Sequence, residues 1–468
     1  MNTGNIGFGG NLSTRLIAAI RIIATLSVFI AYTGFSANTP PAPVAATLRY
    51  PSLSTQDNAR LSWWLNGRFG MFIHWDMSSV AGTEISWSRQ ATKPLDVSKD
   101  KAGYVEDFAY DHLYEKFNPQ KFDATEWVRL AKAAGMKYIV FTAKHHGGFC
   151  MWDTKLTKYS IMSTPFKRDV IKELSDACHK AGMPFGIYYS PRDWHHPDYG
   201  VGDNRKYHEY IKGQLTELLT KYGNVDIMWF DSFGHGDSIQ YWHADEIMAL
   251  VRRLQPKILI NNRSGFFWEK NPATIELLKG DFDTPEERVG SFQYDRPWES
   301  CMCMVKAPDG GWSYRKDGKV KSFEECLTIL VGCAAGDGNL LLDVGPDSSG
   351  EIPADQVALL AEFGAWMKVK GESIYGTRGG PWKPTKTEGS TRKDNVIYVH
   401  LLRWTGEKVT LPAIGRKIKA SSILGGGKVE VDQNEKEISI SVPASDRQPV
   451  DTIIKLELDG SAMNIPIK

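Results

Sequence analysis

The sequence predicts an α/β protein built as a (β/α)8 (TIM-like) barrel followed by a small C-terminal antiparallel β-sandwich. Between about residues 60 and 375, short apolar runs rich in β-branched and aromatic residues alternate with helical stretches, the pattern of parallel strands joined by crossover helices. After about residue 380, strands alternate with turns instead. These changes of pattern divide the chain into four segments: a signal peptide (1–36), a linker (37–56), the barrel (57–378) and the sandwich (379–468).

The first 36 residues have the features of a secretory signal. Arg15 and Arg21 precede an apolar run, and small residues suited to cleavage follow it. The run is about 14 residues long, shorter than the roughly 20 that span a bilayer, so a retained anchor is the weaker alternative. We therefore expect a secreted or periplasmic protein with no stable membrane insertion after the leader is removed.

The barrel segment contains eight candidate strands, each a short apolar run. In chain order they are residues 69–75, 138–144, 184–190, 226–231, 257–263, 280–286, 298–304 and 339–345.

Helical patterns lie between these runs. Residues 124–134 and 169–181 have helical spacing of apolar residues and are followed by Gly135 and Gly182, the residue type that most often ends a helix. Eight strands with crossover helices are the content of a (β/α)8 barrel.

The C-terminal segment has three clear strand patterns, at residues 395–402, 437–442 and 452–458. A glycine triplet at 425–427 marks a turn between them. Alternating strands and turns without helices indicate a small antiparallel sandwich.

The composition is that of an ordinary globular protein. Hydrophobic residues make up 42% and charged residues 24% of the 468, which excludes a disordered chain and a polytopic membrane protein. The net charge of +1 gives no field that would attract nucleic acid, so a neutral substrate fits better. Six cysteines are too few for a disulfide scaffold and match no paired zinc pattern.

Polar residues stand at the C-terminal ends of six candidate strands, where the active site of such a barrel forms. A single one would be an ordinary loop residue, but six that converge on one face predict a site. In strand order they are His74, Lys144-His145-His146, Tyr188-Tyr189, Asp231, Arg263 and Glu286.

Two carboxylates in this set suit a glycosidase. Asp231 directly follows an apolar strand, a rigid position for a nucleophile, and Glu286 ends a strand two places further round the barrel. Retaining glycosidases need such a pair about 5 to 5.5 Å apart, and inverting enzymes need a wider gap. Other acidic residues compete with Glu286 for the role of acid: Asp281, Asp283, Glu287 and Glu299.

A metal hydrolase is a second hypothesis. His145, His146 and Asp231 are potential zinc ligands. Neighbouring residues of a regular strand point to opposite faces, so the two histidines would share a metal only if the strand broke there. Recognition of sugar hydroxyls is the simpler interpretation.

Taken together, several stretches resemble the α-L-fucosidases of glycoside hydrolase family 29. They occur in order across the whole barrel: Arg68-Phe-Gly-Met-Phe-Ile-His-Trp75, Lys144-His-His-Gly-Gly-Phe-Cys-Met-Trp152, Lys167-Arg-Asp169, Phe185-Gly-Ile-Tyr-Tyr-Ser190, Trp229-Phe-Asp231, Asn261-Asn-Arg263, Thr284-Pro-Glu286, Trp298-Glu299 and Asn339-Leu-Leu-Leu-Asp-Val-Gly-Pro346. Each stretch is weak evidence, whereas the ordered set is specific.

The resemblance implies a retaining exo-hydrolase that removes terminal α-L-fucose from fucosylated oligosaccharides or glycoconjugates and uses no metal or organic cofactor. It assigns Asp231 as nucleophile and, by alignment on Trp298-Glu299, Glu286 as acid/base, with Glu299 as the alternative. It assigns the sugar contacts to His74, Trp87, His145, His146, Tyr188 and Arg263.

The sequence departs from the family pattern near Trp87. Ser86 stands where much of the family has glutamate, and Glu84, two residues earlier, is a candidate to supply the same contact. This departure leaves open a related galacto-configured or 6-deoxy sugar. A non-hydrolytic glycan-binding protein on the same fold is a further alternative, which the presence of both Asp231 and Glu286 disfavours.

Overall fold

The structure, a computed structural model, describes residues 54–89, 105–231, 233, 242–264, 272–293, 295–307 and 310–468. The predicted signal peptide, and the linker up to residue 53, lie outside the described residues. The first helix, α1 (Thr55–Gly67), begins after Ser54, whose side chain accepts a hydrogen bond from the backbone N–H of Asp57. No described helix is long and apolar enough to cross a membrane.

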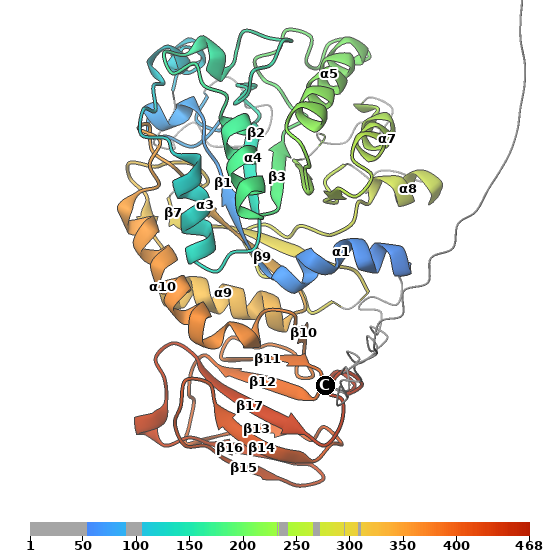
Figure 1. Ribbon diagram of the computed structural model, residues 1–468, viewed down its shortest axis with the longest axis vertical. Coiled ribbons are helices and arrows are strands. Elements are labelled where there is room, and N and C mark those ends of the chain that lie inside the picture. The colour runs from blue at the N-terminus through green and yellow to red at the C-terminus, as the bar shows by residue number, and fades with distance from the viewer. Residues whose placement is uncertain are drawn as a thin grey trace, which may run out of the picture. The chain divides into compact units, whose positions relative to one another are not determined.

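Seven parallel strands form the wall of the barrel, in the spatial order β5-β4-β3-β2-β1-β9-β6 (Figure 1). Each coincides with one of the predicted runs, which confirms the fold class. Their bounds are β1 (Phe69–Ile73), β2 (Ile139–Lys144), β3 (Phe185–Tyr189), β4 (Ile227–Phe230), β5 (Leu259–Ile260), β6 (Glu299–Cys303) and β9 (Asn339–Val344).

The sixth predicted strand in chain order, 280–286, is wrong as a regular strand. This segment crosses the gap between β5 and β6 through isolated parallel bridges: Asn261 with Phe282, Asp283 with Trp298, and Glu286 with Cys301. The cause is local. Gly280 adopts a φ of +62°, and the Asp281 carboxylate itself accepts the backbone N–H of Ile260. Pro285 offers no N–H to a ladder.

The interior and the exterior of the wall are separate apolar cores. Inward-facing side chains such as Phe72, Tyr188 and Trp229 fill the barrel, and Trp64 of α1 packs on Phe282 at its lower end, with ring centroids 4.6 Å apart. A larger core lies between the strands and the surrounding helices. Those helices are α2 (Asp107–Asp111), α3 (Ala124–Ala133), α4 (Val170–Ala181), α5 (Arg205–Lys221), α7 (Ala244–Leu254), α8 (Pro272–Leu278), α9 (Phe323–Ala335) and α10 (Ala354–Lys370).

The C-terminal region is a sandwich of two antiparallel sheets with its own apolar core. The five-stranded sheet has the order β10-β11-β12-β17-β14 and the three-stranded sheet the order β13-β16-β15. The strands are β10 (Arg378–Gly379), β11 (Glu388–Lys393), β12 (Val396–Leu401), β13 (Lys408–Pro412), β14 (Ile418–Ile423), β15 (Glu430–Gln433), β16 (Glu437–Ser441) and β17 (Thr452–Leu458). A separate two-stranded sheet pairs β7 (Val305–Lys306) with β8 (Lys319–Val320).

A buried ionic cluster joins the sandwich to the lower end of the barrel, where α9 packs on β10 and β11 (Figure 1). Asp337, fully buried, contacts Arg68 at 2.6 Å and Arg378 at 2.9 Å. Arg68 also donates to the carbonyl oxygen of Thr377, at 2.6 Å. The barrel and the sandwich are therefore joined at the N-terminal ends of the barrel strands, opposite the C-terminal ends.

Candidate active site

A cavity of about 250 Å³ opens at the C-terminal ends of the barrel strands. Its wall contains all eight residues to which the resemblance assigns a role, together with five others, but not Lys144 or Tyr189, which also lie at predicted strand ends. The lining residues are Phe72, His74, Trp87, His145, His146, Tyr188, Arg192, Trp229, Asp231, Arg263, Glu286, Cys301 and Trp312.

Asp231 follows the last residue of β4 and lies at the centre of the polar contacts. One carboxylate oxygen accepts the Tyr188 hydroxyl at 2.6 Å and lies 3.3 Å from Nε2 of His146. The other lies 3.2 Å from Nη1 of Arg263. Burial opposes ionisation, but His146, Arg263 and the Tyr188 hydroxyl outweigh it and hold the pKa of Asp231 well below its ordinary value. The carboxylate is thus ionised and held in a fixed position in the cavity.

Arg263 links the two predicted catalytic carboxylates. Its Nη1 contacts Asp231, and its Nη2 lies 2.7 Å from the carboxylate of Glu286, so one guanidinium separates the two acids. The Arg263 side chain stacks over the Trp229 ring at 4.5 Å, which fixes its plane. The Glu286 side chain is 44% exposed and the Asp231 side chain 17%. The inner carboxylate therefore faces the sugar pocket and the outer one faces the mouth, where a leaving group would depart.

Three buried histidines form the other side of the pocket. Burial lowers the pKa of His145 to about 4 and lowers the pKa values of His74 and His146 well below the ordinary value. All three are therefore neutral near pH 7. Because an ionised Asp231 has no proton to give, Nε2 of His146 donates to it, and Nδ1 of His146 accepts the Ser190 hydroxyl at 2.6 Å.

His74 is held from behind by a second buried carboxyl group. Its Nδ1 lies 2.7 Å from Asp343, the fifth residue of β9, and its backbone N–H donates to Val344. Burial raises the pKa of Asp343 well above its ordinary value. The contact with Asp343 therefore fixes the orientation of the His74 ring, which lines the cavity.

The rim near Trp87 differs from the arrangement that the resemblance implies. Trp87 is 37% exposed and packs edge-on against His146 and Trp194. Ser86 is buried, and its hydroxyl accepts the backbone N–H of Gly147 at 2.7 Å, which supports the loop that carries the histidine pair. Glu84 is also buried, 3.8 Å from Arg315, and is not part of the cavity wall. Neither Ser86 nor Glu84 lines the cavity.

Glu299, the alternative acid, lies far from the mouth of the pocket. It is the first residue of β6, at the lower end of the barrel, where it accepts hydrogen bonds from Trp64 and Tyr138. Burial raises its pKa to about 7. The structure thus brings Glu286, and not Glu299, to the pocket that holds Asp231.

The potential metal ligands do come together. β2 ends at Lys144, so His145 and His146 leave the strand, and their ring nitrogens and the Asp231 carboxylate lie within 4.8 Å of one another. However, Asp231 already receives Tyr188 and the positive charge of Arg263. A dication bound to the same carboxylate would be repelled by that guanidinium, so this donor set fits zinc poorly.

The other lining residues were not predicted from the sequence because they do not end a predicted strand. Trp312 lies in the segment between β7 and β8 and contacts His74, with ring centroids 5.0 Å apart. Arg192 lies two residues beyond Ser190 in the loop after β3. Cys301 and Trp229 lie on strands and point inward, a position that alternation along their strands would have indicated.

A carboxylate pair at the C-terminal face of a TIM-like barrel, walled by aromatic and imidazole side chains, defines a glycoside hydrolase. Comparison with known proteins identifies the family: residues 41–372 match the alpha-L-fucosidase family, and the chain belongs to it. The plasma alpha-L-fucosidase of Homo sapiens is 29% identical over 388 residues, 77% of this chain and 80% of that protein.

Solved structures agree. Alpha-L-fucosidase isoenzyme 1 from Paenibacillus thiaminolyticus superposes with a TM-score of 0.76 at 32% identity, covering 86% of this chain and 100% of that one. A family 29 alpha-L-fucosidase from Bacteroides thetaiotaomicron, solved as a trapped covalent intermediate with 2-fluoro-fucosyl fluoride, superposes with a TM-score of 0.74 at 26% identity, covering 86% and 96%.

Proposed function

We propose that the protein is a retaining exo-α-L-fucosidase that acts on fucosylated glycans. The observation that carries this proposal is the pair of carboxylates on one guanidinium: Asp231, ionised and buried, and Glu286 at the mouth. Membership of the alpha-L-fucosidase family and the covalent intermediate of the Bacteroides relative support the choice of sugar and of mechanism.

In this proposal each step of the reaction has a named group. Asp231 attacks the anomeric carbon while Glu286 protonates the departing oxygen, which gives a glycosyl ester on Asp231 and a free aglycone. Glu286, now ionised, takes a proton from water, and the resulting attack breaks the ester and releases fucose. The neutral imidazoles and Tyr188 offer donors and acceptors for the sugar hydroxyls.

Turnover of nitrophenyl α-L-fucoside by single variants tests this assignment. Asp231→Ala is expected to lose at least about 10³-fold in kcat because the nucleophile is gone. Glu286→Ala is expected to regain turnover with azide, which replaces the missing group and yields fucosyl azide. Glu299→Ala is the matched control, and no azide rescue is expected for it. An Asp231→Ala enzyme with wild-type kcat would overturn the proposal.

We also propose that the enzyme is exported. The charged N-terminal region, the apolar run and the small residues before position 37 support a cleaved leader. N-terminal sequencing of the protein recovered outside the cytoplasm is expected to show a chain that begins after residue 36. A full-length chain retained in the membrane fraction would contradict this proposal.

A further inference from the structure

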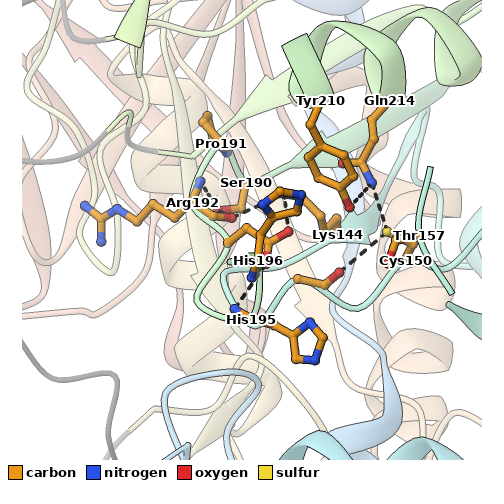
Figure 2. Close-up of polar contacts among 12 residues, drawn as sticks. Lys144, Cys150, Thr157, Ser190, Pro191, Arg192, His195, His196, Tyr210 and Gln214 are labelled. Atoms are coloured by element: carbon orange, nitrogen blue, oxygen red, sulfur yellow. Dashed lines mark hydrogen bonds and ion pairs between the residues drawn. The ribbon is translucent and has the colours of Figure 1, made fainter. Parts of the chain in front are cut away.

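Arg192 carries a charge that the proposed mechanism does not use. Of the four charged side chains that line the cavity, Asp231, Arg263 and Glu286 are joined by ion pairs. In the part of the chain that the structure describes, the guanidinium of Arg192 has no hydrogen-bonded or ion-paired partner. Figure 2 shows it extending away from the polar cluster around Lys144.

The backbone of Arg192 is fixed, so its side chain starts from a defined place. Its N–H donates to Ser190 Oγ at 3.1 Å, and its carbonyl oxygen accepts from the Lys144 ammonium at 3.3 Å (Figure 2). Lys144 is fully buried and also contacts Asp193 and the Tyr207 hydroxyl, at 3.3 and 3.2 Å. A buried ion pair therefore anchors the loop that presents Arg192.

An aromatic surface flanks the same part of the rim. The backbone N–H of Trp194 donates to His146, and the Trp194 and Trp87 rings meet edge to face with centroids 5.1 Å apart. The charge of Arg192 also acts on the pocket, since after burial and Asp231 it contributes to the pKa of His145. A cation that lines the same cavity as a partly exposed aromatic ring is complementary to a sugar ring that carries an anionic substituent.

We propose that Arg192 is a specificity-determining residue that binds an anionic substituent, a sulfate or a carboxylate, on the sugar attached to fucose. This inference rests on the proposed fucosidase function and extends it to the aglycone. Within the fucose pocket the two carboxylates both contact Arg263. The guanidinium of Arg192, which has no partner among the described residues, can therefore bind a substituent of the sugar beyond the scissile bond. Sulfate and carboxylate both accept the paired N–H groups of a guanidinium, so the choice between them belongs to the experiment.

The test compares three disaccharides in which α-L-fucose is linked to galactose, to galactose 6-sulfate or to galacturonic acid. Fucose release gives kcat/KM for each, at low and at high salt. The native enzyme is expected to prefer at least one anionic substrate, and in Arg192→Gln the ratio of anionic to neutral kcat/KM is expected to fall by about 10-fold or more. High salt is expected to reduce the preference of the native enzyme alone.

Two further variants control for charge. Arg192→Lys keeps the positive charge and is expected to keep part of the preference. Arg129→Gln removes an exposed arginine of α3 and is expected to leave the ratio unchanged.

The outcomes separate this inference from the function on which it rests. A preference for the sulfate alone or the carboxylate alone identifies the ligand. The inference is overturned if Arg192→Gln loses kcat/KM equally on all three disaccharides, or if the native enzyme shows no preference for an anionic substrate. In either case, release of fucose still upholds the fucosidase function. If no fucose is released from any disaccharide or from nitrophenyl α-L-fucoside, both are overturned.

Discussion

At the scale of single residues, the site combines one ionised carboxylate with neutral histidines. Asp231 stays ionised in a buried position because a guanidinium and donors surround it, while burial keeps the nearby histidines neutral. Neutral imidazoles place hydrogen-bonding groups beside Asp231 without adding further positive charge. In the proposed function, the same residues bind the sugar hydroxyl groups and keep the nucleophile ionised.

The pH profile should depend on Arg263. Since the pKa of Asp231 is depressed, its carboxylate is ionised over the working range and protonates only in strong acid. Arg263→Gln removes a charge that lowers this pKa, so the acid limb of kcat/KM is expected to move to higher pH, and kcat to fall by about 10²-fold or more. Arg263→Lys is the control that retains charge. An unchanged acid limb in Arg263→Gln would contradict this account of Asp231.

Metal removal tests the other interpretation of the same residues. Because Arg263 opposes a dication on Asp231, incubation with EDTA followed by dialysis is expected to leave fucoside turnover unchanged. Metal analysis of the purified enzyme is expected to show no stoichiometric zinc. Loss of activity that added zinc restores would instead assign His145, His146 and Asp231 as ligands.

At the scale of elements, the sequence predicted most of the site because regular strands deliver side chains to a known face. His74, Tyr188 and Asp231 were found by this rule alone. Trp312 and Arg192 could not be found by it, because they lie on irregular segments whose course depends on contacts distant in the chain. The segment 280–286 was wrong as a regular strand because Gly280, the Asp281 side chain and Pro285 replace the ladder, so that isolated bridges connect it to its neighbours.

The buried acid at the base of β6 should affect stability and not catalysis. Glu299 has a pKa of about 7 in the folded protein against an ordinary value near 4.5, so the folded state retains a proton that the unfolded state releases. Its contribution is fully present below pH 4.5 and is lost as the pH rises through 7, by about 3 kcal/mol over that window.

Urea denaturation of the native enzyme and of Glu299→Gln across pH 4.5 to 8 measures this effect. The difference in free energy of unfolding between the two proteins is expected to change with pH in the direction given, with the variant gaining relative stability at high pH. Exposed Glu126→Gln serves as the control. A constant difference across the range would show that Glu299 does not titrate there.

At the scale of the whole molecule, the sandwich is attached at the end of the barrel that carries no chemistry. Asp337 lies between Arg68 and Arg378 with all three side chains buried, so the attachment depends on one carboxylate that compensates two cations. This arrangement allows the mouth of the pocket to remain open to a large glycan while the C-terminal domain stabilises the opposite end.

Asp337→Ala should therefore weaken folding without altering the site. Removal of the carboxylate leaves buried guanidinium charges without their counterion, and we expect a loss of about 3–5 kcal/mol in the free energy of unfolding. KM for nitrophenyl α-L-fucoside is expected to stay at its native value under conditions where the variant is folded. The role given to this cluster would be refuted if Asp337→Ala unfolded at the same midpoint as the native enzyme. It would also be refuted if the variant kept native stability but had a changed KM.

The irregular segment between β5 and β6 gives the two carboxylates unequal freedom. Asp231 directly follows a strand hydrogen-bonded on both sides, whereas Glu286 belongs to a stretch held by isolated bridges. The two carboxylates have different roles in the proposed retaining cycle. Asp231 forms and breaks one bond to the anomeric carbon, whereas Glu286 first protonates the leaving group and then accepts a proton from water. Directed evolution towards new acceptors should therefore accumulate changes around Glu286, where repositioning disturbs few backbone contacts, and leave the strand before Asp231 untouched.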